Sequence, residues 1–167
     1  VPPISTPNRV AIEAGELQIV IENTGHGLRI AGLTDRATKT ELTPAEPAPL
    51  FSLVLRDAQT KELLTVPADS DWKQADVAFS DTTGTYTLTF RNLKDDRLEG
   101  IEVKVTLDVD DANSALIWDL QVANENSQWA LWRVAFPQAA VRDLGEDGRV
   151  FAQVTSGVEL AGMWTKG

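Results

Sequence analysis

The chain has 167 residues, a length that fits one domain with a single sizeable core. Its 25 acidic and 15 basic side chains give a formal net charge of −10, which repels phosphate backbones and anionic lipids. We therefore expect no nucleic-acid partner and no membrane partner, and no apolar run approaches the roughly 20 residues that span a bilayer. The chain has no cysteine and one histidine, which excludes disulfides, thiolate nucleophiles and sulfur-ligated zinc.

Apolar and polar residues alternate with a period of two through most of the chain, and this pattern indicates β-strands rather than helices. The stretch 43–49 contains three prolines, cannot supply a run of ladder donors, and is predicted to be a loop. In the first half of the chain the alternation predicts strands over residues 17–22, 27–33, 51–56, 62–66 and 75–80.

Residues 84–137 can be paired on the basis of their apolar faces. The first predicted hairpin places Phe90 opposite Ile101, and the second places Trp118 opposite Leu107. In both hairpins apolar residues meet apolar residues and polar residues meet polar ones, as one buried face requires.

A third predicted hairpin turns around residues 125–127 and sets Trp132 opposite Leu120, which adds a fourth strand to this sheet. In that register Trp118 and Trp132 both point inward, so we expect them in the core. A face this wide must be covered by a second sheet, which the first half of the chain has to supply. The sequence thus predicts an all-β, two-sheet antiparallel β-sandwich that forms one domain over residues 1–167.

The same register predicts a flat outer surface on the last two strands. Trp129 and Arg133 would project from one strand, and Asp119 and Gln121 from its neighbour. Sugar rings stack on indoles, and their hydroxyls bond to carboxylates, amides and guanidinium groups, so this surface is predicted to bind a polysaccharide. Trp72, in a polar stretch, is predicted as a further ligand contact. The alternative is a packing surface that a loop or a neighbouring domain covers.

No cofactor is expected for such a platform, but one acidic turn leaves calcium open. Asp108, Asp110, Asp111 and Asn113 space their oxygen atoms as calcium loops do. The turn lacks the glycine and the distal glutamate of an EF-hand loop, and Asp and Asn are ordinary residues of hairpin turns. A plain turn and a calcium site are therefore the two interpretations.

Two passages resemble galactose-mutarotase-like supersandwich domains. Residues 17–42 read as a strand, a glycine turn and a second strand ending in Thr38-Lys39-Thr40-Glu41-Leu42. The passage W-R-V-A-F-P at 132–137, followed by L-G-E-D-G at 144–148, is similar to the N-terminal β-domains of some large bacterial glycoside hydrolases. The resemblance implies a bacterial, extracellular or periplasmic protein whose chain continues into a downstream catalytic barrel domain. It implies no catalytic residue in these 167 positions.

Three functions remain as hypotheses at this point. The first is a non-catalytic carbohydrate-binding or accessory module of a carbohydrate-active enzyme. The second is a small carboxylate-dependent glycoside hydrolase or lyase, because 25 acidic residues offer many carboxylate pairs at the spacing that glycosidases use. The third is a structural or assembly module that binds another polypeptide and no small ligand.

Overall fold

The computed structural model describes residues 4–6, 8–43, 46–142, 149–152 and 158–161. These residues form antiparallel strands and one 3-10 helix, η1 (Asp96–Leu98), and none of them forms a helix long and apolar enough to cross a membrane. The strands are β1 (Ile4–Thr6), β2 (Arg9–Ala14), β3 (Leu17–Asn23), β4 (Leu28–Asp35), β5 (Thr40–Glu41), β6 (Ser52–Asp57), β7 (Leu63–Pro67), β8 (Trp72–Ser80), β9 (Thr85–Leu93), β10 (Ile101–Asp110), β11 (Ala115–Asn124), β12 (Trp129–Ala135), β13 (Arg149–Ala152) and β14 (Val158–Ala161).

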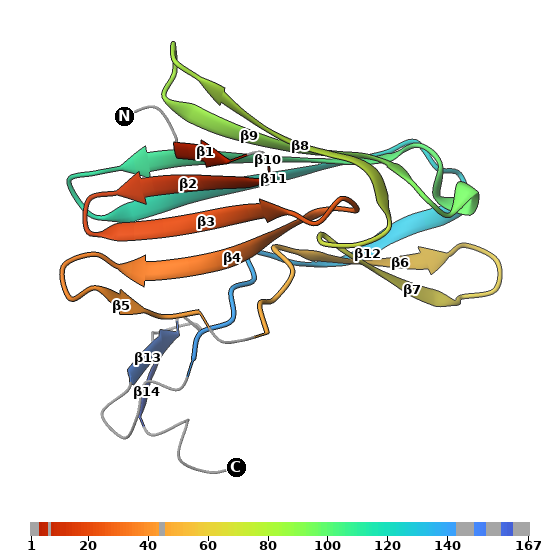
Figure 1. Cartoon of the computed structure of the whole chain (residues 1–167). Coiled ribbons are helices and arrows are strands. Elements are labelled where there is room, and N and C mark those ends of the chain that lie inside the picture. Colours follow the sequence, from red (N-terminus) through yellow and green to blue (C-terminus); the bar gives the residue numbers. More distant parts are fainter. Residues whose placement is uncertain (1–3, 7, 44–45, 143–148, 153–157, 162–167) are drawn as a thin grey trace.

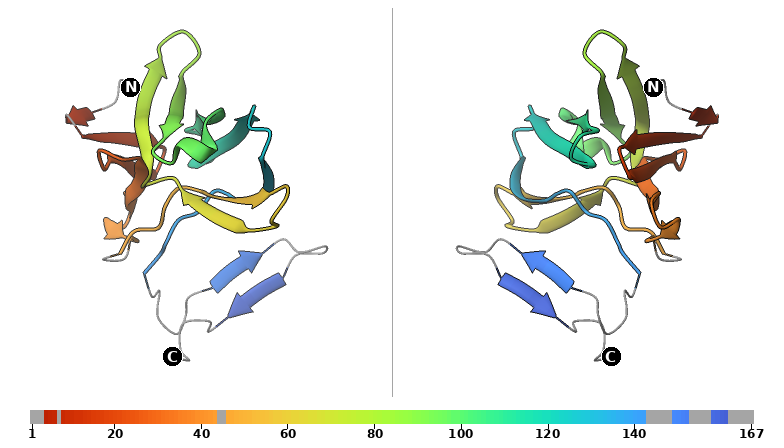
Figure 2. Two further views of the ribbon diagram at one scale, coloured as in Figure 1. Left: turned by 90° about the vertical axis from the view of Figure 1, so that its right-hand side faces the viewer. Right: turned by 90° about the vertical axis from the view of Figure 1, so that its left-hand side faces the viewer.

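The strands pair in the orders β1-β2-β3-β4-β5, β11-β10-β9-β8 and β12-β6-β7, with β13 and β14 as a separate hairpin. The five-stranded and three-stranded sheets lie next to each other along the length of β10 and β11 (Figure 1). They meet where the amide of Leu28 donates to the carbonyl of Ala68 at 2.8 Å. Seen along the strands, β6 and β7 lie across the core from β10 and β11 (Figure 2). The predicted all-β antiparallel sandwich is therefore confirmed.

One core cluster draws on all three of the larger sheets. Its aromatic centre is formed by Phe51, Trp72 and Phe90, each of which is fully buried. The ring of Phe90 meets that of Phe51 edge-on at 4.8 Å and that of Trp72 at 5.5 Å, a favourable geometry for aromatic pairs. These ring contacts join the two layers at the centre of the sandwich.

The hairpins of the second half differ in how well the alternation predicts their register. β10 and β11 pair as predicted, with Trp118 opposite Leu107. β9 pairs with β10 two residues away from the prediction, so that Phe90 faces Val103 rather than Ile101. The reason is a longer connection that contains η1, whose start is capped by the Asp95 carboxylate, which accepts from the amide of Arg97. A shift of two residues keeps every side chain on its predicted face.

The predicted position of the last strand of this group is wrong. β12 does not pair with β11 but with β6 in the opposite layer, where Trp129 faces Asp57 and Val134 faces Leu53. The register shifts at Trp132, which forms a bulge between the two halves of the strand. The bulge places Trp129 and Val134 on the same inward side of the sheet as Leu53, although their positions differ by five and regular alternation would put them on opposite sides.

Polar side chains around the turn before β12 direct it to β6. The Asn126 side chain donates to the carbonyls of Arg97 and Glu99 at 2.8 and 2.9 Å and accepts from the amides of Gln128 and Trp129. The side-chain amide of Gln128 donates to the Asp57 carboxylate at 2.6 Å. These bonds fix the end of the turn against the hairpin of β6 and β7, so β12 enters the opposite sheet.

Candidate functional site

In the structure, the polar residues of the predicted sugar-binding platform lie on two different layers of the sandwich. Asp119 and Gln121 are exposed on the outer face of β11, where the Gln121 amide donates to the Asp119 carboxylate at 3.1 Å. Arg133 is also exposed, but it lies in β12 opposite Val54 of β6 and therefore belongs to the other layer. Asp119 does not face Arg133 across paired strands, so the predicted combination of these polar groups does not form.

Trp129 of the predicted platform and Trp72, the further predicted ligand contact, are both buried, so the prediction that they face solvent is wrong. The Trp72 indole lies in the aromatic centre and donates to the carbonyl of Pro67 at 2.9 Å. The Trp129 ring faces inward opposite Asp57, and the Arg97 guanidinium lies 5.7 Å from its centroid. Its buried Nε1 has no hydrogen-bond partner. Neither ring can stack on a ligand from solution.

Trp132, which the sequence predicts in the core, is instead 60 % exposed. The guanidinium of Arg56 lies 4.6 Å from the centroid of its ring, and Leu63 pairs with Arg56 from the next strand, β7. Arg133 follows Trp132 and pairs with Val54, on the same outer side of β6 as Arg56. We call Trp132, Arg56, Arg133 and Leu63 the Trp132 face.

The sequence contains no visible signal for the Trp132 face, because a bulge reverses the inward and outward positions of a strand without changing its composition. The face offers one accessible indole, an exposed aliphatic side chain and two guanidinium groups on three paired strands. Such a surface can stack on a flat apolar group and donate several hydrogen bonds.

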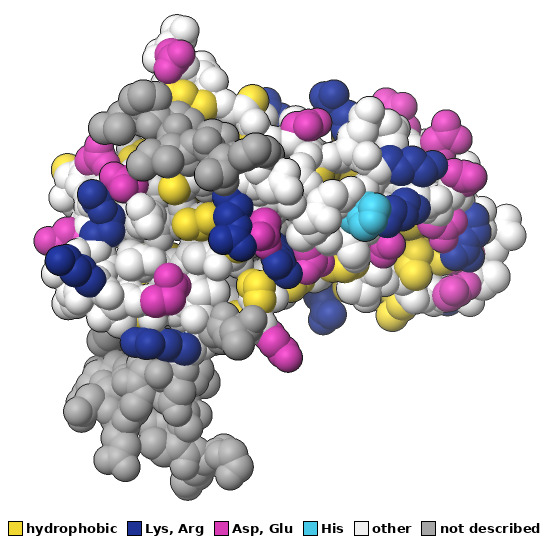
Figure 3. Space-filling view, in the orientation of Figure 1, with side chains coloured by type: hydrophobic (Ala, Val, Ile, Leu, Met, Phe, Trp, Pro, Cys, Tyr) yellow, Lys and Arg dark blue, Asp and Glu magenta, His cyan; other side chains and the backbone are white. Residues whose placement is uncertain are grey.

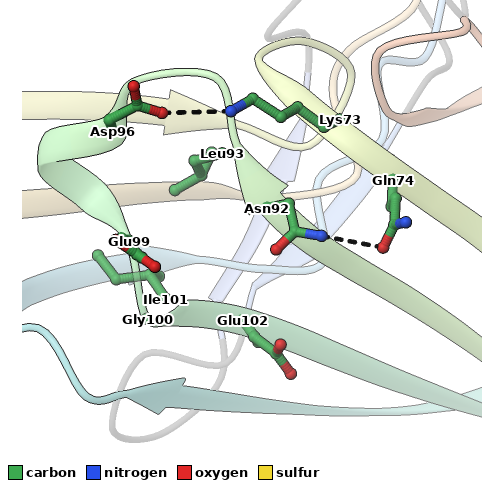
Figure 4. A pocket seen from close by; sticks show the side chains of 9 residues that line it. All are labelled: Lys73, Gln74, Asn92, Leu93, Asp96, Glu99, Gly100, Ile101 and Glu102. Carbon is green, nitrogen blue, oxygen red and sulfur yellow. Dashed lines mark hydrogen bonds and ion pairs between the residues drawn. The ribbon is translucent and has the colours of Figure 1, made fainter.

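A polar pocket of about 410 Å³ lies between η1 and the strands β8, β9 and β10. In Figure 4 the Lys73 ammonium approaches the Asp96 carboxylate, at 3.2 Å, and the Asn92 amide donates to the Gln74 side chain at 3.1 Å. The pocket was not predicted from the sequence. Its polar groups largely bond to one another, so it presents few of them to a ligand.

The carboxylates of this pocket bear on the hydrolase hypothesis. The side chain of Asp96 is 93 % exposed, and Glu102 is half-exposed and lies 3.6 Å from the guanidinium of Arg91. A general acid of a glycosidase is usually kept protonated by burial in apolar surroundings. The carboxylates of Asp96 and Glu102 are open to water and do not have such surroundings.

The acidic turn between β10 and β11 uses its oxygen atoms within the chain. Asp111 accepts from the amide of Gly15 at 3.0 Å, and Asp108 accepts from the Thr85 hydroxyl at 2.6 Å. Hydrogen bonds from Asn113 hold the pKa of the Asp110 carboxyl below its usual value. Gly15 has a φ of +55°, and a Cβ there would lie 2.6 Å from the Asp111 carbonyl oxygen. The turn thus braces the connection between β2 and β3.

Within the described residues, no group of three or more His, Cys, Asp or Glu side chains is arranged to hold a metal ion. Acidic and basic side chains are interspersed over the face of the molecule that Figure 3 shows.

Apolar side chains gather on the side of the sandwich formed by β11 and β12, which we call the open side. Leu131 and Val134 are exposed there although they pair with the buried Leu55 and Leu53, whereas the exposed Ile117 and Trp132 lie on the outer faces of the two layers. A further row of apolar residues on β11 is only half-buried although it packs on the core, namely Leu116, Trp118, Leu120 and Val122. An accumulation of this kind is typical of surfaces that another molecule covers.

Of the residues that the resemblance rests on, 144–148 lie outside the described part of the chain. Comparisons of the chain with protein-family models, with curated proteins and with solved structures find no match.

Proposed function

We propose that the chain is a non-catalytic carbohydrate-binding accessory module, and that it contacts polysaccharide through the Trp132 face. The observation that carries this proposal is the 60 % exposed indole of Trp132 on the surface of a paired sheet. Large aromatic rings are normally buried, so an indole exposed on the outer face of a paired sheet favours a binding role.

The chemistry around this ring suits a sugar chain. The apolar C–H face of a pyranose can stack on the side of the indole that Arg56 leaves uncovered, and the guanidinium groups of Arg56 and Arg133 can donate to hydroxyls. Each such contact contributes about 1 kcal/mol, so we expect dissociation constants in the range of about micromolar to millimolar. Asp119 and Gln121 are too displaced, in the other layer, to form part of the same contact.

The wider context of the proposal comes from the resemblance at residues 132–137, which include Trp132 itself. It supports a bacterial protein, extracellular or periplasmic, in which a downstream domain in cis performs catalysis. In that arrangement the module would hold the enzyme on its polymeric substrate.

Affinity gel electrophoresis tests the glycan proposal, with a panel of soluble polysaccharides cast in native gels. We expect at least one polysaccharide to retard the wild-type chain and the Trp132→Ala variant to migrate freely. The matched control is Ile117→Ala, because Ile117 is 58 % exposed but lies on β11 in the other layer. Retardation that survives Trp132→Ala, or no retardation by any polysaccharide of the panel, contradicts the proposal.

The open side favours a second candidate, a module that binds another polypeptide. Its exposed and half-exposed apolar residues follow two neighbouring strand edges over several residues, which exceeds what one stacked sugar ring covers. This candidate is compatible with the first, because the Trp132 face and the edge of β11 lie on different sheets.

A further inference from the structure

The edge of β11 lacks the features that normally protect a sheet edge. Proteins prevent unwanted strand pairing with lysine, proline, bulges or very short edge strands. β11 has ten residues, contains no lysine, proline or glycine, and pairs with β10 at every position without a register shift. In the described part of the chain no strand pairs with its other side.

The other edge of the open side is protected. β12 carries the bulge at Trp132 and the charged Arg133 beside it, and both features oppose the regular pairing of an added strand. Of the two edges, only β11 therefore presents a long and regular row of backbone donors and acceptors.

The inward row of β11 is incompletely covered. Three of its members, Trp118, Leu120 and Val122, pair with residues of β10 that are buried, namely Leu107, Val105 and Val103, whereas the β11 residues themselves stay half-buried. The Trp118 ring meets Phe136 edge-on at 6.2 Å and so reaches across to the opposite layer. A strand beyond β11 with apolar residues at alternate positions would complete this burial.

The outer row of β11 indicates the charge of the segment that fits. Asp119 stands at its centre, exposed, between Ile117 and Gln121. A basic residue opposite Asp119 would form a favourable cross-strand pair, whereas a second acidic residue would be repelled. A second copy of this chain is a poor occupant, because two chains of net charge −10 repel each other.

We infer that β11 accepts an extended segment of another polypeptide as an added strand, with alternating apolar residues facing the core and a basic residue opposite Asp119. Backbone bonds to β11 provide the attachment, and the apolar row of Leu116, Trp118, Leu120 and Val122 provides the specificity for alternation. The inference develops the second candidate function and does not depend on glycan binding.

A synthetic peptide tests it, with the capped sequence Thr-Val-Thr-Val-Lys-Val-Thr-Val-Thr as the probe. A peptide of the same composition without alternation serves as its control. We expect only the alternating peptide to bind and to protect from exchange the β11 amides that do not bond to β10, as hydrogen exchange resolved by NMR would show.

Exchanging the charges of Asp119 and of the peptide's lysine then tests whether the two side chains lie opposite each other. Asp119→Lys should weaken binding of the lysine peptide about fivefold, and replacing the peptide's lysine by glutamate should restore it. The matched control is Asp76→Lys, since Asp76 is exposed in β8 at the opposite edge of the same sheet. Both variants change an exposed position, so folding should be unaffected.

Three results would overturn the inference. The first is equal binding of the two peptides, the second an equal effect of Asp119→Lys and Asp76→Lys, and the third a dimer that protects the same amides without peptide. Trp132→Ala should leave peptide binding unchanged, so the failure of the glycan proposal and the failure of this one are separate outcomes.

Discussion

The aromatic centre and the open side belong to the same core, yet tryptophan side chains are buried to very different extents in the two regions. Trp72 packs edge-on against Phe51 and Phe90 and is fully buried, whereas Trp118 is half-buried and has one aromatic neighbour, Phe136. Both tryptophans lie on edge strands of the same sheet, Trp72 on β8 and Trp118 on β11, and each of these strands has one paired neighbour. The difference shows that the rings packed against a tryptophan, and not the residue type or a place at the sheet edge, decide how deeply it is buried.

Among the changes that test this comparison, removal of the Trp72 side chain should cause the largest loss of stability. Trp72→Ala deletes a fully buried ring and is expected to lower the free energy of unfolding by about 3 to 5 kcal/mol. Urea denaturation followed by far-UV circular dichroism measures the loss. Trp72→Phe keeps most of the packing but loses the bond to the Pro67 carbonyl, so its loss should be clearly smaller.

The next largest effect is expected from acid, which should weaken the attachment of β12 to β6 through the Asp57 carboxyl. The Asp57 carboxyl is 2 % exposed and accepts from the amides of Thr60 and Gln59 and from Gln128, and these bonds lower its pKa to about 2 from 3.8. A lowered pKa in the folded state stabilises the fold above about pH 4, and this contribution disappears as the pH falls toward 2.

The Asp57→Asn variant isolates this contribution from that of other carboxyls, such as Glu41, whose pKa is also lowered to about 2. Thermal unfolding of the two proteins between pH 6 and pH 2 is the measurement. We expect the difference in Tm between them to be greatest above pH 4 and to shrink below it. A difference that stays constant over this range would show that Asp57 is not the titrating group.

On the open side, Trp118→Ala should cost less than the same change at Trp72. The ring is only half-buried, so about 1 to 2 kcal/mol of the free energy of unfolding is expected to be lost. Urea denaturation under the same conditions gives the comparison directly. A loss as large as that of Trp72→Ala would mean that the open side is packed as tightly as the aromatic centre.

The smallest effect on stability is expected from Trp132→Ala. Its exposed ring contributes little burial, and its contact with the Arg56 guanidinium is worth about 0.5 to 1 kcal/mol at a site open to water. The free energy of unfolding should therefore change by no more than about 1 kcal/mol. A larger loss would show that Trp132 is part of the packed structure rather than an accessible surface.

The alternation in the sequence predicts the strands and most of their faces, because a two-residue period records which side of a strand is buried. It predicts the pairing of Trp118 with Leu107 as the structure has it. The apolar pattern does not name the partner of a strand, however, since Val134 can face Leu53 as well as a residue of β11. That choice rests on Asn126 and the other polar groups of the turn.

The candidate site was harder to predict than the fold for the same reason. One bulge at Trp132 exchanges the environments of two tryptophans three residues apart, so Trp129 is buried and Trp132 is exposed. Asp119 and Gln121, on the regular strand β11, have the exposed positions predicted for them. The exposure of the site residues on the regular strand was therefore predicted correctly, whereas that of the two tryptophans of the bulged strand was not.

The unprotected edge of β11 has a consequence for how the protein behaves in concentrated solution. At neutral pH the net charge of −10 keeps the chains apart and makes sheet-to-sheet association through this edge slow. The isoelectric point calculated from the sequence is about 4.5, and there the repulsion vanishes while the edge is unchanged. Solubility should consequently reach a sharp minimum near this pH, and buffers for storage and crystallisation are best chosen well above it.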